Sequence, residues 1–140
     1  MVVVAIVTIL ASIAYPSYVS HVARSNRSEG ISALVTMSGD LERYFTVNSE
    51  YTTFITAADD ANGDGNLGFA DNLSETGLYA LSITSNNDLS IYTITAAPVR
   101  VDALCGSFTL TNTGVRAVTG DADGDGNTNP DDDDLNICWR

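Results

Sequence analysis

The sequence predicts an α+β protein in which a long N-terminal α-helix packs on an antiparallel β-meander sheet, an arrangement shaped like a ladle. Residues 1–14 carry no charge, and a more polar stretch with helical periodicity follows to about Phe45. From Tyr51 onward, short runs rich in Ile, Tyr and Thr alternate with turn residues, which is typical of strands. A sheet of this kind needs a cover on one face, and the amphipathic part of the helix is the available cover.

The helix is expected to have two parts. Its initial apolar run is shorter than the roughly 20 residues that span a bilayer, and it lacks the positive flank of a secretory signal. Small residues such as Ala5 let helices approach closely, and Pro16 should kink or loosen the helix because it removes a backbone donor. We therefore expect residues 1–24 to form an apolar helix that packs on copies of itself or on other helices. Residues 25–140 should form a head that includes the amphipathic half of the helix.

Apolar residues between Ile31 and Phe45 recur at the spacing of one helix face, which predicts the face that packs on the sheet. The members of this stripe are Ile31, Leu34, Val35, Met37 or Ser38, Leu41, Tyr44 and Phe45. The polar turns 85–88 and 112–114 separate β-prone runs, and consecutive strands with short turns imply an antiparallel meander. The expected strands are 78–84, 89–97, 105–111 and 115–119.

The chain is strongly acidic, with eighteen Asp and Glu residues against six Arg and no Lys, and its net charge is −12. The electrostatic field of so negative a chain repels the phosphates of nucleic acids, so nucleic acid is not an expected partner. Most of the acids lie in two short windows, 59–71 and 121–134. Carboxylates concentrated beside Gly and Asn indicate cations as ligands.

Two loops have the spacing of calcium-binding loops, with Asx side chains at alternate positions, a Gly at the bend and a carboxylate at the end. No helix is expected beside either loop, and the alternative for each is that Asp, Asn and Gly simply form turns. The predicted ligands of the first loop are Asp60, Asn62, Asp64, Asn66 and Asp71. Those of the second are Asp121, Asp123, Asp125, Asn127 and one carboxylate of residues 131–134, for which Asp132 is preferred. We therefore expect one or two Ca²⁺ ions as cofactors.

The chain holds two cysteines, Cys105 and Cys138. An even count in an exported chain favours one disulfide in an oxidising compartment, and two buried thiols in a cytosolic protein are the alternative. The sequence contains no nucleotide-binding glycine loop and no constellation of a catalytic triad. We therefore do not expect an enzyme.

Several segments carry a resemblance to a known family. The runs VAIVTILASIAYPSY at 4–18, RSNRSEG at 24–30 and ERYFTVNSEYT at 42–52 resemble type IV pilins of the type IVa group. The run LCGSFTLTNTGV at 104–115 and the pair CW at 138–139 resemble the later strands and the closing disulfide of that group. The first set of motifs is highly specific for the family, and the second is moderately so.

The resemblance begins inside the family's N-terminal segment. Family members have a leader, then an N-methylated Phe, then a short stretch with a glutamate that is held to pair with the N-terminus of a neighbouring subunit. The leader and roughly six residues have no counterpart before Met1, and those residues would complete the roughly 20 of a membrane span. We expect the sequence to begin late, at an internal methionine.

The resemblance implies a structural subunit that polymerises helically into an extracellular type IV pilus, with adhesion, motility or DNA uptake as its roles. It implies further copies as the main partner, through the N-terminal helices, together with the pilus assembly machinery and the inner membrane of a bacterium before assembly. One alternative is a pseudopilin of type II secretion, whose major subunit binds calcium in the resembled family. The other is a minor pilin that captures DNA, which the net charge opposes unless Arg100, Arg116 and Arg140 converge on one face.

Overall fold

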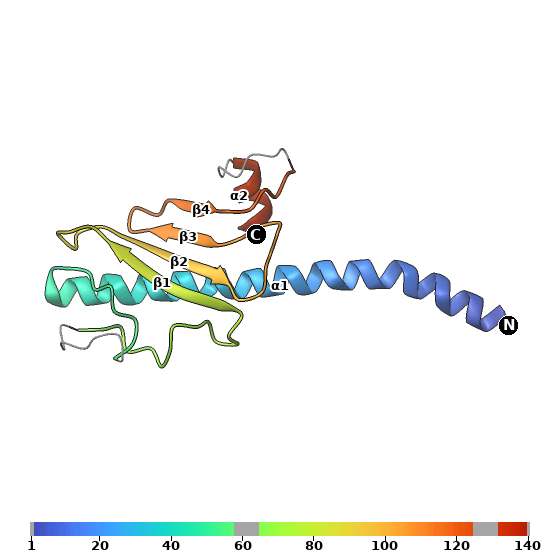
Figure 1. Ribbon diagram of the computed structural model, residues 1–140, viewed down its shortest axis with the longest axis horizontal. Coiled ribbons are helices and arrows are strands. Elements are labelled where there is room, and N and C mark those ends of the chain that lie inside the picture. The colour runs from blue at the N-terminus through green and yellow to red at the C-terminus, as the bar shows by residue number, and fades with distance from the viewer. Residues whose placement is uncertain (1, 58–64, 125–131, 140) are drawn as a thin grey trace.

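The computed structural model describes residues 2–57, 65–124 and 132–139, and before Tyr18 it describes the side chains of Val4 and Tyr15 only. Within these residues, a long helix is followed by a four-stranded sheet and a short C-terminal helix (Figure 1). The bounds are α1 Val2–Asn48, β1 Tyr79–Ser85, β2 Tyr92–Pro98, β3 Phe108–Thr111, β4 Arg116–Val118 and α2 Asp132–Cys138. The predicted arrangement of a long helix on an antiparallel sheet is confirmed.

The sheet is an antiparallel meander in the order β1-β2-β3-β4, as the short turns predict. Side chains alternate between a more and a less buried face along β1 and β2. Two strands, β2 and β3, begin three residues later than predicted. β2 begins at Tyr92 because Leu89 adopts a left-handed conformation, with a φ of 51°, in the preceding turn. β3 begins at Phe108 because Cys105 is held in a disulfide outside the sheet.

The core lies between α1 and the sheet, where α1 contacts β1, β2 and β3. Leu34, Met37 and Leu41 of α1 are fully buried, which confirms the main part of the predicted stripe. The sheet contributes Leu81, Tyr92, Ile94, Ala96 and Phe108 to the same core. The prediction that Val35 faces the sheet is wrong. Its side chain is 59% exposed, because one residue turns a helix by roughly 100° and carries Val35 away from the face of Leu34.

Gly30 lets α1 lie against the ring of Tyr79. Gly30 is buried, and a Cβ on it would stand 3.0 Å from the ring carbons of Tyr79. Tyr79 is itself 2% exposed. Burial, together with the charge of Asp102, raises the pKa of Tyr79 to about 12, so the phenol stays neutral. A glycine inside this helix is therefore explained by a close contact with the sheet.

The N-terminal part of α1 projects away from the head (Figure 1). Its described side chains include Tyr15, Tyr18 and Val19, which are 73%, 70% and 50% exposed. α1 continues as an α-helix through Pro16, and its path bends within the blue N-terminal part of Figure 1. A loosening of the helix at Pro16 stays a prediction. Among the helices that the structure describes, none is long and apolar enough to cross a membrane.

Candidate functional site

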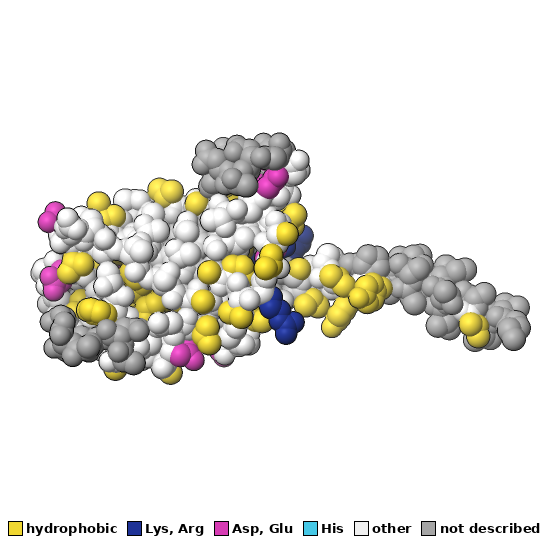
Figure 2. All heavy atoms as spheres, in the orientation of Figure 1, with side chains coloured by type: hydrophobic (Ala, Val, Ile, Leu, Met, Phe, Trp, Pro, Cys, Tyr) yellow, Lys and Arg dark blue, Asp and Glu magenta, His cyan; other side chains and the backbone are white. Residues whose placement is uncertain are grey.

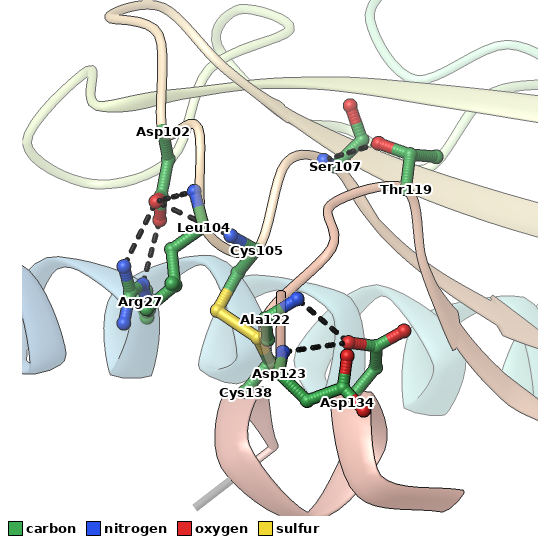
Figure 3. Close-up of a disulfide and its surroundings, with 10 residues drawn as sticks. All are labelled: Arg27, Asp102, Leu104, Cys105, Ser107, Thr119, Ala122, Asp123, Asp134 and Cys138. Atoms are coloured by element: carbon green, nitrogen blue, oxygen red, sulfur yellow. Dashed lines mark hydrogen bonds and ion pairs between the residues drawn. A yellow bond between two sulfur atoms is a disulfide. The ribbon is translucent and has the colours of Figure 1, made fainter. Parts of the chain in front are cut away.

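The two cysteines form a disulfide that closes the C-terminal part of the head, so the predicted disulfide is confirmed (Figure 3). Cys105 lies before β3 and Cys138 is the last residue of α2, and their Cα atoms are 5.7 Å apart. Both cysteines are buried in the core. The sequence separation is 33 residues, and closing a loop of that length stabilises the folded state by about 3–4 kcal/mol in the chain-entropy model.

An ion pair beside the disulfide joins this region to α1 (Figure 3). Arg27 Nε lies 2.6 Å from Asp102 Oδ2, and Arg27 Nη2 lies 2.8 Å from Asp102 Oδ1. The Asp102 carboxylate also accepts backbone N–H bonds from Leu104 at 3.2 Å and Cys105 at 3.3 Å. Burial alone would raise the pKa of Asp102, but these hydrogen bonds outweigh burial and hold the pKa below its usual range. Asp102 therefore stays ionised and ties α1 to the disulfide-bonded segment.

Two glycines let the segment before β3 pass close to the segment after β4. Gly120 N donates to the carbonyl of Cys105 at 3.1 Å, and a Cβ on Gly120 would overlap the backbone of Leu104. Gly106 has a φ of +60°, which favours glycine at this position. Sequence reasoning did not find this crossing. The available signal was a glycine directly after a cysteine and a second one directly after the last strand.

An acidic cluster lies at the base of α2. Asp121, Asp123 and Asp134 each offer a carboxylate oxygen, and these oxygens lie within 4.8 Å of one another. Asp134 is 1% exposed and accepts hydrogen bonds from the N–H of Ala122 at 2.6 Å and of Asp123 at 3.3 Å (Figure 3). Three carboxylates at this spacing could hold a metal ion, since hard divalent cations prefer oxygen ligands.

The structure brings together part of the predicted second calcium loop. Asp121 and Asp123 belong to the cluster, and the carboxylate that joins them is Asp134, whereas Asp132 was the preferred choice. The side chain of Asp132, like Asp125 and Asn127, lies outside the described residues, so their roles as ligands stay predictions.

The expectation that no helix lies beside the second loop is wrong, because α2 follows it directly. Carboxylates in the first turn of a helix interact favourably with its dipole. The acids that precede Leu135 therefore favour a helix start, and this was the signal that the sequence offered.

The first predicted calcium loop is described only at its end. Asp60, Asn62 and Asp64 lie outside the described residues. Asn66 Oδ1 accepts a hydrogen bond from the N–H of residue 68 at 2.9 Å, and Asp71 Oδ1 accepts one from the N–H of residue 73 at 3.1 Å. Both bonds are local turn contacts. A calcium site in this loop stays a prediction.

A second carboxylate fastens the segment before β1 to α1. Glu29 accepts hydrogen bonds from the hydroxyl of Ser74 at 2.5 Å and from Thr76, through its hydroxyl at 2.6 Å and its N–H at 3.0 Å. Burial acts to raise the pKa of Glu29, but these bonds together hold it below its usual range. The helix is therefore tied to the head by Glu29 on one segment and by Arg27 on another.

A family model described as "Type IV minor pilin ComP, DNA uptake sequence receptor" matches residues 16–109. Among solved structures, a type IV pilin from Shewanella oneidensis is similar to the chain, with 24% sequence identity and a TM-score of 0.49. The alignment covers 66% of this chain and 88% of that one. None of the curated proteins matches the chain significantly.

Proposed function

The chain belongs to the type IV pilin family, and we propose that it is a filament subunit that enters a type IV pilus through the projecting part of α1. Proteins of this family are structural and not enzymatic. They are located in the pilus at the cell surface, and in the inner membrane before assembly.

The observation that carries this proposal is the exposure of apolar side chains on the projecting helix. Tyr15, Tyr18 and Val19 have at least half of their surface in water. Burial of apolar surface is favourable by about 25 cal/mol per Å², and the head of the same chain does not cover these side chains. Parallel helices of further copies supply such a cover. Contacts between two different patches do not close on themselves, so they generate an open helical filament.

A charge placed on the projecting helix tests the proposal. Val19→Asp should lower the amount of the subunit in sheared surface fibres by at least about tenfold, because an unpaired carboxylate is costly among apolar side chains. Val115→Asp is the matched control, since Val115 is also exposed, at 61%, but lies between β3 and β4. Equal recovery of both variants would contradict assembly through this helix.

Long fibres made mainly of this subunit would separate a major pilin from a minor one and from a pseudopilin.

A second candidate role is the capture of DNA. The observation that favours it is the family model, whose description names a DNA uptake sequence receptor. This goes against the expectation, drawn from the net charge of −12, that nucleic acid is not a partner. Arg100 and Arg116 are exposed on the head, and Arg116 lies 5.2 Å from the centroid of the Trp139 ring. Arg140, the third arginine of the expected group, lies outside the described residues.

DNA binding by the full chain can be measured as a function of salt. If the candidate role is right, duplex DNA should bind at low salt and the affinity should fall steeply as salt rises, because phosphate contacts release counterions. Arg100→Gln and Arg116→Gln should each reduce the salt slope by about 1. Arg43→Gln is the control, since Arg43 is paired with Asp40. Absence of binding at low salt would remove the DNA role and leave the filament role untouched.

We also propose Ca²⁺ as the cation of the cluster formed by Asp121, Asp123 and Asp134. Three carboxylates, one of them buried, are the support for this proposal. Calcium at about 100 times its Kd should raise the free energy of unfolding by about 2.7 kcal/mol, and Asp134→Asn should abolish the gain. If the unmodified chain has the same melting temperature in calcium and in chelator, the cluster forms turns and does not bind calcium.

A further inference from the structure

The five arginines of the described residues differ in their contacts. Arg27 is paired with Asp102 and Arg43 with Asp40, and Arg116 lies over an indole ring. Arg24 and Arg100 are exposed and form no ion pair within the described ranges. In a chain with three times more acids than bases, two unpaired arginines in one place offer a contact for an acidic surface.

Arg24 and Arg100 lie on one surface at the end of the head from which the helix projects. Arg24 borders a groove of about 520 Å³, and Arg100 borders a second groove of about 360 Å³. Ala23 and Leu104 line both grooves, so the two arginines flank a continuous surface. Figure 2 shows the dark-blue atoms where the projecting helix leaves the head.

We call this the base surface and define it by two arginines and three exposed apolar residues. Its members are Arg24, Arg100, Val101, Leu104 and Ile137. Val101 is 94% exposed, and the surface therefore combines positive charge with apolar groups that water does not favour. The acidic cluster of Asp121, Asp123 and Asp134 lies near Cys138 (Figure 3), and a bound divalent cation would offset two of its three negative charges.

The opposite end of the head also combines charged and exposed apolar side chains, but its charged side chains are acidic. The tip surface consists of Val47, Glu50, Asp88 and Ile91, all of which are exposed. Its parts are held together because Tyr51 N donates to the carbonyl of Leu89 at 2.8 Å, which ties the end of α1 to the turn before β2. Figure 2 shows magenta atoms at this end.

We propose that the base surface of one copy docks on the tip surface of the next copy, with Arg24 and Arg100 facing Glu50 and Asp88. Copies that are parallel and displaced along the axis of α1 bring these two ends together. The contact joins two different surfaces, so each copy can receive one neighbour and offer its other end to another, which extends without closing. The inference rests on the proposed function as a filament subunit whose neighbours are copies of itself, and it adds a contact between heads to the burial of helices.

Charge exchange is the first test. The pair R24E/R100E and the pair E50R/D88R should each lower recovery of the subunit in sheared fibres by about tenfold, because every subunit uses the contact at both ends. The variant with all four changes should recover at least half of the wild-type amount, since the charges are exchanged and not lost. Glu75→Arg is the control for charge alone, because Glu75 is exposed and belongs to neither surface. One-sided variants that assemble like wild type, or a fourfold variant that stays defective, would overturn the proposal.

A cysteine pair is the second test, and it does not depend on charge. The described cysteines are both in the disulfide, so V101C/D88C adds two new thiols at the two surfaces. Oxidation of fibres should give a ladder of crosslinked copies, whereas V101C or D88C alone should give none. Fibres without the ladder, or a crosslink to a different protein, would contradict docking of a second copy.

These outcomes separate the inference from the filament role itself. If Val19→Asp removes the subunit from fibres but the charge variants and the crosslink have no effect, only the head contact is wrong. If the unmodified chain is absent from fibres, both proposals are wrong. If R24E/R100E releases the chain from phosphatidylglycerol vesicles and no crosslink forms between copies, the arginines contact lipid headgroups and not a second copy.

Discussion

The two halves of α1 form one continuous helix but lie in different surroundings. In the embedded half, residues 27–48, Leu34 and Leu41 are fully buried against the sheet. In the projecting half, residues 2–22, the described side chains of Tyr15 and Tyr18 are more than two-thirds exposed. The embedded half has a one-sided apolar stripe, whereas the projecting half consists mainly of apolar residues. The head therefore covers the apolar side chains of the embedded half, whereas Tyr15 and Tyr18 of the projecting half stay exposed.

Truncation in the embedded half should have the largest effect on the head. Leu34→Ala removes a fully buried side chain and should lower the free energy of unfolding by about 2–5 kcal/mol, since a cavity remains. Val35→Ala is the neighbouring control and should stay within about 0.5 kcal/mol, because Val35 is exposed. Urea unfolding followed by circular dichroism measures both. Equal losses for the two variants would mean that the embedded half is not held by its buried face.

The ion pair at the boundary between the halves should come second. Asp102→Asn should lower stability at pH 7 by about 1.5–3 kcal/mol, because it weakens hydrogen bonds to a charged partner that is largely buried. Asp40→Asn is the matched control, and the loss should stay below about 1 kcal/mol because Arg43 is 75% exposed.

The same pair predicts a dependence of stability on pH. The pKa of Asp102 is lower in the folded state than its ordinary value of about 3.9. Its contribution to stability is therefore fully present above that ordinary value and is lost as the pH falls through the folded pKa. Glu29 acts in the same direction, so the comparison of wild type with Asp102→Asn isolates the part that belongs to Asp102. Parallel stability curves from pH 7 to pH 2 would contradict a role of this carboxylate.

A methyl group at the helix–sheet contact should have a smaller net effect. Gly30→Ala places a Cβ against the buried ring of Tyr79, and overpacking of this kind costs about 1–3 kcal/mol. Better helix propensity offsets up to about 1 kcal/mol of that cost. Gly39→Ala meets nothing within 4 Å, so it should raise the melting temperature. A rise for both variants would show that α1 does not need the close approach at Gly30.

Truncation in the projecting half should have the smallest effect on the head. Tyr18→Ala should change the free energy of unfolding by no more than about 0.5 kcal/mol, because the side chain is exposed. The same variant should lower the amount of subunit in fibres, because the proposed packing of copies buries the surface that Tyr18 provides. A large loss of head stability would show that Tyr18 belongs to the embedded half after all.

The sequence predicted those parts of the molecule that depend on local pattern. The stripe with Leu34 and Leu41, the order of strands and the disulfide partners follow from periodicity, short turns and an even cysteine count. Contacts between distant segments were missed, because no local pattern encodes them. The pairing of Arg27 with Asp102 joins residues 75 positions apart. Asp134 enters the acidic cluster because α2, which was not expected, turns it toward Ala122.

The Cys105–Cys138 bond also decides what a single cut in the backbone can do. The bond encloses β3, β4 and the loop before α2. A protease that cleaves once inside this span leaves two pieces that remain covalently joined, so the C-terminus is not lost. Such a nick would give one band on a gel without reductant and two bands with it. A subunit that is cleaved once within this span therefore stays in one covalently joined piece, and a fibre outside the cell loses no fragment.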